Sequence, residues 1–211
     1  MIKFLYKLFR FILTPIIFFA DFLQNNLTSF FTPMNMGPVS EDSYLLYIKK
    51  NIRKKDYVLD FGSGAGFFSN IFNPNKYLGV EINNNFVAVS KKNNKKYKYR
   101  VLKNNYLRGY EKRINLIFIN NVLHHLTDKQ IIDTFSFFEK NLKKRTEVFI
   151  IEPLFPKTFF SLEFFLKVLD IGNNIKTKKN YLSLFKKVLS IKNYKVRKVG
   201  IGSVLIIKGH I

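Results

Sequence analysis

The chain of 211 residues contains no cysteine and no tryptophan. Without cysteine there can be no disulfide bonds, thiolate zinc sites, iron–sulfur clusters or cysteine nucleophiles. A reducing, cytoplasmic compartment is compatible with this absence. Whatever chemistry the chain performs must therefore use oxygen and nitrogen side chains, or a bound cofactor.

Acidic residues are also scarce. The chain has 14 Asp and Glu against 36 Lys and Arg, so its formal net charge is +22. Such a balance favours polyanionic partners, either nucleic acid or an anionic membrane surface. The lysines are spread along the whole chain, however, and Asn, Ile and Phe are abundant with them, as a biased genome composition would produce. The charge alone does not distinguish a binding surface from an ordinary solvated one.

The order of apolar segments predicts the fold class. The length and a hydrophobic content of 47% suit one α/β domain with a sizeable core and a short appendage. Strands are expected at 57–61, 77–82, 99–102, 114–120 and 147–152, and helices at 40–52, 127–144, 158–170 and 178–190. Such alternation predicts a doubly wound, mostly parallel sheet. Two further strands, 194–199 and 203–207, are separated by only three residues, which predicts an antiparallel hairpin at the end.

Residues 1–31 differ from the rest of the chain. Lys3, Lys7 and Arg10 recur at helical spacing, so a helix would place them on one face. The nearly apolar run 11–20 is interrupted by a proline and is shorter than the about 20 residues of a membrane span. We expect an N-terminal amphipathic helix on a membrane surface, with packing on the protein or on a second subunit, or a true span, as alternatives. Residues 32–39 are expected to be a linker, and 40–211 the main domain.

Residues 58–66 carry the most informative motif, Val-Leu-Asp-Phe-Gly-Ser-Gly-Ala-Gly. An apolar strand ends in an acid, and three glycines follow at alternate positions, which is typical of a tight turn whose backbone approaches a ligand. The dinucleotide-binding fingerprint needs glycine at position 67, which is Phe, and the Lys-Ser or Lys-Thr of a P-loop is absent. A glycine-rich turn without a ligand is the alternative.

This Asp-x-Gly-x-Gly-x-Gly form resembles the cofactor loop of class I S-adenosylmethionine-dependent methyltransferases. The resemblance covers roughly residues 40–208 and implies a Rossmann-like, seven-stranded sheet that ends in an antiparallel hairpin. It also implies S-adenosylmethionine as the cofactor. The methionine part would lie against Gly62, Ser63, Gly64 and Gly66, with Asp60 near its ammonium group.

Glu81 ends the second expected strand, 21 residues after Asp60. A carboxylate there can accept both ribose hydroxyls of a nucleoside, with Ile82 beside it, although an exposed strand-end glutamate is the alternative. Asn104 and Asn105 stand where the family often has an acid that meets the adenine amine. Asn115 is a second departure, because many relatives carry Asp there. These departures keep open a member that binds the cofactor without transferring a methyl group.

Residues 120–126, Asn-Asn-Val-Leu-His-His-Leu, resemble a stretch common in small-molecule methyltransferases, including those of quinone biosynthesis. The Asn-Pro-Pro-Tyr form used on nucleic-acid bases is absent. The resemblance adds Asn121 to the cofactor site. His124, His125 and Glu152 are the candidate catalytic residues, since histidine titrates near working pH and Glu152 ends a strand at the same sheet edge. Adjacent histidines cannot readily face one pocket, so a structural role for each is an equal alternative.

Residues 153–189 would then cover the acceptor. This segment is rich in phenylalanine and forms either an apolar acceptor pocket or an ordinary helix core; its phenylalanines include Phe155, Phe159, Phe160, Phe164 and Phe165. We expect methyl transfer to a small-molecule or lipid-like acceptor at the cytoplasmic membrane face, with no metal site. The alternatives are an RNA or protein methyltransferase that uses the basic surface, or the non-catalytic member. The acceptor, the methylated atom and the oligomeric state stay open.

Overall fold

The computed structural model describes residues 2–16, 18, 41–156, 158, 161, 164, 167–168, 172, 174–199 and 202–211. The linker expected at 32–39, most of the helix expected at 158–170 and two residues of the hairpin link lie outside the described residues. Of the five phenylalanines expected in the acceptor cover, Phe159, Phe160 and Phe165 also lie outside them.

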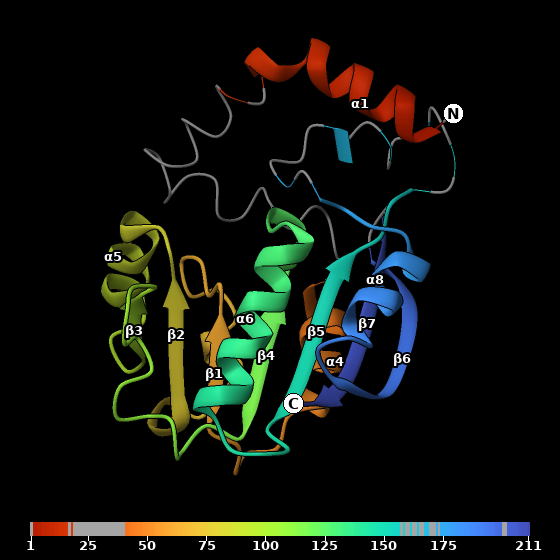
Figure 1. Ribbon diagram of the computed structural model, residues 1–211. Coiled ribbons are helices and arrows are strands. Elements are labelled where there is room, and N and C mark those ends of the chain that lie inside the picture. The colour runs from red at the N-terminus through yellow and green to blue at the C-terminus, as the bar shows by residue number, and fades with distance from the viewer. Residues whose placement is uncertain are drawn as a thin grey trace.

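Seven strands form one sheet in the order β3-β2-β1-β4-β5-β7-β6 (Figure 1). The strands are β1 (Val58–Phe61), β2 (Tyr77–Glu81), β3 (Lys98–Val101), β4 (Leu116–Asn120), β5 (Glu147–Pro153), β6 (Ser190–Val199) and β7 (Gly202–His210). Neighbours from β3 to β5 pair in parallel, whereas β7 runs antiparallel to both β5 and β6. The predicted parallel sheet with a terminal hairpin is confirmed.

The helices are α1 (Ile2–Ile12), α4 (Glu41–Lys50), α5 (Asn84–Asn93), α6 (Asp128–Asn141) and α8 (Lys178–Phe185). Helix α6 begins with a capping box, in which Thr127 and Gln130 each bond the other's backbone amide. The helix expected at 178–190 is wrong at its end, because α8 stops at Phe185 and Ser190 already pairs with His210 in the sheet. Pairing with β7 sets this boundary, and the local sequence pattern does not contain that information.

Side chains of the strands alternate between two apolar layers. Leu59 and Phe61 face the layer that α6 and α8 cover, and Val58 faces the layer that α4 and α5 cover. Figure 1 shows α6 in front of the sheet and α4 behind it. Both faces of the central strands are therefore buried, which explains why β1, β2, β4 and β5 are mostly apolar. The polar side chains of the central strands therefore lie at or near the ends of the strands.

Helix α1 lies across the carboxyl ends of the parallel strands (Figure 1). Tyr6 is buried there with Phe164 and Val168, and the ring of Tyr6 meets Phe155 edge-on at 5.1 Å. Within the N-terminal segment a helix thus covers Ile2–Ile12 and packs one of its faces on the protein, while residues 19–31 of that segment lie outside the described residues. No helix in the described part of the chain has the length and apolarity needed to cross a membrane.

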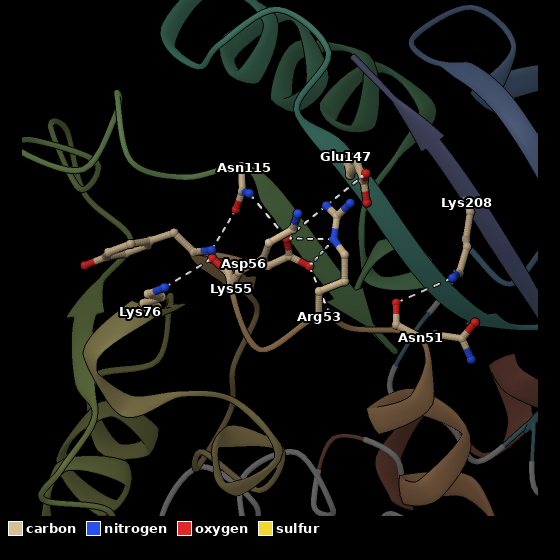
Figure 2. A network of polar contacts seen from close by, with 9 residues as sticks. Asn51, Arg53, Lys55, Asp56, Lys76, Asn115, Glu147 and Lys208 are labelled. Atoms are coloured by element: carbon tan, nitrogen blue, oxygen red, sulfur yellow. Dashed lines mark hydrogen bonds and ion pairs between the residues drawn. The ribbon is translucent and has the colours of Figure 1, made fainter.

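A polar network ties the opposite, amino ends of the strands together (Figure 2). The buried carboxylate of Asp56 accepts bonds from the backbone N–H and the guanidinium of Arg53, which also pairs with Glu147 at 3.0 Å. Asn115 accepts the N–H of Tyr57 at 2.6 Å and donates to Asp56 at 3.3 Å. An amide can do both, whereas the aspartate of many relatives would set a second carboxylate against Asp56. The asparagine at position 115 therefore has a structural role in this network.

We expect Asn115→Asp to lower the free energy of unfolding at pH 7 by about 1–3 kcal/mol, because the donor to Asp56 is lost and a like charge replaces it. Urea denaturation measures this loss. Asn75→Asp, at an exposed position of the same sheet end, is the control and should change stability little. Equal stability of Asn115→Asp and the wild type would contradict this account of the network.

Candidate functional site

The carboxyl ends of β1, β2, β4 and β5 form the candidate site. The chain runs outward from β1 through β2 to β3 and then returns to β4 on the other side of β1. Ligands in open α/β sheets bind at such a reversal of strand order, outside the carboxyl ends of the strands. The glycine loop after β1 and the turn after β4 both lie there.

The three loop glycines adopt the left-handed region, with φ of +77° at Gly62, +52° at Gly64 and +80° at Gly66. A Cβ at Gly62 would overlap the side chain of Val122, and one at Gly66 would meet the hydroxyl of Tyr99 at 2.5 Å. A Cβ at Gly64 would meet nothing within 4 Å. Packing thus requires the outer two glycines, while the backbone at Gly64 borders open space in which a ligand can approach.

The backbone of the loop is anchored to β2. The amides of Gly62 and Ser63 both donate to the carbonyl of Val80, at 2.8 and 3.0 Å. The hydroxyl of Ser63 is buried without a hydrogen-bond partner among the described residues. A Cβ at Gly79 in β2 would lie 2.9 Å from that hydroxyl. The Ser63 side chain is therefore turned toward β2.

Asp60 lies beneath the loop and is only 3% exposed. Its carboxylate accepts the hydroxyl of Tyr77 at 2.6 Å. Burial raises the pKa of Asp60 to about 7; the Tyr77 bond opposes that rise and the nearby charge of Glu81 adds to it. This group therefore titrates in the neutral range, directly under the glycine loop.

Glu81 joins the end of β2 to the glycine loop. Its Oε2 accepts the amide of Gly64 at 3.0 Å, and its Oε1 accepts those of Ile82 and Asn83 at 2.7 and 3.0 Å. A carboxylate offers about four acceptor positions, so one position on Oε2 is left for a further donor. The side chain of Ile82 is 72% exposed beside it. A ligand that carries both a hydroxyl donor and an apolar ring could therefore contact Glu81 and Ile82 at the same time.

The loop after β3 begins beside the end of β2, because the amide of Leu102 donates to the carbonyl of Glu81 at 2.7 Å. Asn104 and Asn105 are exposed there, and Asn105 has φ of +65°. Both asparagines are thus on the same side of the sheet as Glu81.

Arg100 organises this loop, and sequence reasoning missed it. Its guanidinium donates to the carbonyls of Tyr106 and Arg108 at 2.8 and 2.9 Å and lies over the ring of Tyr110 at 4.6 Å. Within a chain so rich in basic residues, nothing in the sequence sets this arginine apart. Only the folded loop shows that Arg100 satisfies backbone carbonyls.

Glu152 is fully buried at the end of β5. Its carboxylate accepts the amides of Val122 at 2.8 Å, Leu123 at 2.7 Å and His124 at 3.2 Å, together with the His124 Nδ1 at 2.9 Å. These four donors occupy the whole acceptor capacity of the carboxylate. Glu152 therefore holds the turn after β4, which includes the short helix η4 (Leu123–His125) and Asn121, exposed with φ of +56°.

The two histidines have different surroundings. His124 is 3% exposed, its ring lies against Gly172, and its carbonyl accepts the amide of Asn174 at 2.8 Å. His125 is exposed, with its ring 4.1 Å from that of His124, centroid to centroid. Of the three candidate catalytic groups, only the imidazole of His125 reaches solvent at this edge. No group of three or more metal-ligating side chains occurs in the described part of the chain.

Comparisons with known proteins agree with this geometry. Residues 38–183 match the methyltransferase domain family. A SAM-dependent methyltransferase from Methanosarcina mazei superposes with a TM-score of 0.60 at 14% identity, over 78% of this chain and 97% of that one. Geranyl diphosphate methyltransferase, solved with GPP and sinefungin, gives 0.63 at 12% identity, over 81% and 78%.

The mitomycin 7-O-methyltransferase MmcR gives a TM-score of 0.61 at 14% identity, over 81% of this chain and 53% of that one. This chain thus spans about half the length of that enzyme. No curated protein matches the sequence. At these identities the structures show the shared fold, and the family match covers more than half of the chain. The chain therefore belongs to the methyltransferase domain family and is a class I S-adenosylmethionine-dependent methyltransferase.

Proposed function

We propose that this enzyme methylates a small-molecule or lipid-like acceptor, and that His125 removes the acceptor proton. The observation that carries the proposal is the contact between Gly62 and Val122, which sets the glycine loop beside the turn that bears His125. Cofactor loop and solvent-facing base thus share one sheet edge. Geranyl diphosphate methyltransferase and the mitomycin enzyme, whose names give small molecules, support this acceptor class.

The residues at this edge fit S-adenosylmethionine. The open space at Gly64 admits a ligand against the backbone, the free acceptor position of Glu81 suits a ribose hydroxyl, and exposed Ile82 suits the face of a purine. The cofactor, when bound, supplies a methyl group on a cationic sulfur. The proposed binding set is Asp60, Gly62, Ser63, Gly64, Gly66, Glu81, Ile82, Asn104, Asn105 and Asn121.

Aligning the acceptor and removing its proton are the tasks of the turn after β4. An exposed imidazole can accept a proton from a hydroxyl or an ammonium group. Glu152 and His124 are buried and hold each other by the 2.9 Å bond, so we assign them the positioning of His125. A protonated His125 then returns its proton to water.

The experiment that tests this function follows the label from methyl-tritiated S-adenosylmethionine into cell-extract fractions. Label in a small-molecule or lipid fraction, lost with His125→Ala, supports the proposal. Label only in RNA or protein would favour the alternative that uses the basic surface. Tight cofactor binding without transfer to any fraction would favour a non-catalytic member.

We also propose that the reaction takes place on the cytoplasmic face of an anionic membrane. Helix α1 exposes apolar side chains to solvent, among them Phe11, which is 78% exposed. No acidic residue occurs between residues 2 and 16, and the chain carries a net charge of +22. An apolar helix face together with a basic charge is the combination that binds interfaces reversibly.

The cofactor site predicts two affinity losses. Glu81→Ala should weaken S-adenosylmethionine binding by about 1.5–3 kcal/mol, because charge-assisted hydrogen bonds are lost. Gly64→Val should abolish binding, because a branched side chain fills the open space and opposes the positive φ. Calorimetric titration measures both. Glu139→Ala, at an exposed position on α6, is the control; an unchanged affinity of Gly64→Val would overturn the site assignment.

Asp60 predicts a pH dependence of stability. Its folded-state pKa of about 7 lies above the unfolded value, so its contribution is fully present below pH 4 and is lost as pH rises through 7. Asp60→Asn should therefore be more stable than the wild type at pH 8, by about 2 kcal/mol or more, with the difference vanishing toward pH 4. Urea denaturation across this range measures it. A difference independent of pH would show that Asp60 does not titrate as described.

His125 and Glu152 predict separable defects. His125→Gln should lower kcat at least about 100-fold with an unchanged cofactor affinity, since a general base typically contributes that much. Glu152→Ala should chiefly lower the free energy of unfolding, because four buried donors lose their acceptor. Turnover, calorimetry and denaturation on both variants measure the separation. If His125→Gln turns over normally, the base lies elsewhere.

A further inference from the structure

Helix α1 is apolar on two sides. Its inner side packs on the protein through Tyr6, Phe9 and Leu13. Its outer side exposes Leu8 by 43%, Phe11 by 78% and Ile12 by 61%. A helix that only packs on its own domain keeps one side polar. The outer side of α1 is therefore built for contact with something other than water.

The exposed apolar side chains continue just beyond the helix, where Ile16 is 58% and Phe18 is 73% exposed. Elsewhere in the described part of the chain, exposed large apolar residues occur one or two at a time, as at Leu46 of α4, Phe137 of α6 and the pair Tyr194 and Val196 of β6. Single exposures of that kind are ordinary, whereas a contiguous cluster marks an interaction site. We call Leu8, Phe11, Ile12, Ile16 and Phe18 the outer face.

Charge indicates what covers the outer face. Lys3, Lys7 and Arg10 follow one another at helical spacing, and no acid occurs from residue 2 to residue 16. Lys7 is exposed, while Arg10 is fixed at the inner contact by a 3.3 Å bond to the carbonyl of Val168. An apolar stripe with the exposed Lys7 on the same helix, in a segment without acids, complements anionic headgroups above acyl chains.

The inner side of α1 is connected to the site by a series of contacts. Tyr6 packs edge-on against Phe155, whose amide donates to the carbonyl of Lys176 at 2.9 Å. The same segment donates from Asn174 to the carbonyl of His124 at 2.8 Å. Since α1 lies across the carboxyl ends of the strands (Figure 1), whatever the outer face touches lies on the site's side of the sheet.

We propose that the outer face of α1 seats on an anionic lipid bilayer while the inner side stays packed, so that the site edge faces the bilayer and the acceptor is a lipid-dissolved molecule. The part on the acceptor rests on the proposed function. The docking itself depends only on α1. The proposal thus narrows the acceptor from small molecules in general to those that partition into a membrane.

The test uses the full chain and vesicles of phosphatidylglycerol and phosphatidylcholine in equal amounts. The wild type should co-sediment with them, and binding should weaken as salt is raised and on pure phosphatidylcholine. The variant Phe11→Ser/Ile12→Ser should bind at least tenfold more weakly. Its matched control, Tyr194→Ser/Val196→Ser, removes two exposed apolar side chains from β6 and should bind like the wild type.

Orientation is tested separately, because the cysteine-free chain permits labelling at single introduced cysteines. A fluorophore at Ile16→Cys should be quenched by brominated lipids. One at Asn75→Cys, at the opposite end of the sheet, should not be quenched. Equal quenching at both positions would overturn the proposed orientation.

The failures of the two proposals are distinguishable. Binding of S-adenosylhomocysteine is titrated in every variant, and the unfolding transition shows that each variant is folded. A folded chain that binds S-adenosylhomocysteine but not vesicles overturns the docking and the proposed membrane location, and leaves methyl transfer to a small-molecule acceptor standing. Vesicle binding equal in wild type and outer-face variant also overturns the docking. A dimer in lipid-free solution that this variant abolishes would assign the outer face to a second copy of the chain.

Discussion

One buried carboxylate, that of Glu152, holds the turn on which the site depends. It is fully buried and accepts three consecutive backbone amides and the Nδ1 of His124. A buried charge is tolerated only when hydrogen bonds satisfy it, and here all of its acceptor positions are used. The bonds in turn satisfy three consecutive amides at the start of the short helix η4. The end of β5 thus determines the conformation of the chain that follows β4.

That conformation extends to the glycine loop through Val122, whose side chain occupies the space that Gly62 leaves free. On the other side of the loop, Val80 accepts two of its amides and Glu81 a third. Two carboxylates at strand ends, Glu81 and Glu152, therefore organise the amides of two neighbouring turns. Glu81 retains an acceptor position that a ligand can use, whereas Glu152 retains none. We therefore propose a binding role for Glu81 and a structural role for Glu152.

The sequence was sufficient for the fold because its strands are apolar runs bounded by glycines and acids, and because 200–202 is too short for a parallel crossover. It placed Gly64 and Glu81 by motif spacing. It could not show that Glu152 and His124 pair across 28 residues, because no local pattern encodes that contact. The same limit applies to Asn115. Its hydrogen bond to Asp56 explains why an amide replaces the acid there, but this bond is visible only in the fold. The packing of α1 on Phe155 could not be predicted from a local pattern either.

The central claim is that the edge formed by Gly64, Glu81 and Ile82 is a nucleoside cofactor site. Calorimetric titration of the purified protein with S-adenosylmethionine, S-adenosylhomocysteine and NAD tests it most directly. The account predicts micromolar binding of the first two and none of NAD, because the glycine spacing and Phe67 depart from the dinucleotide pattern. A folded protein that binds none of them, or that prefers NAD, would contradict it.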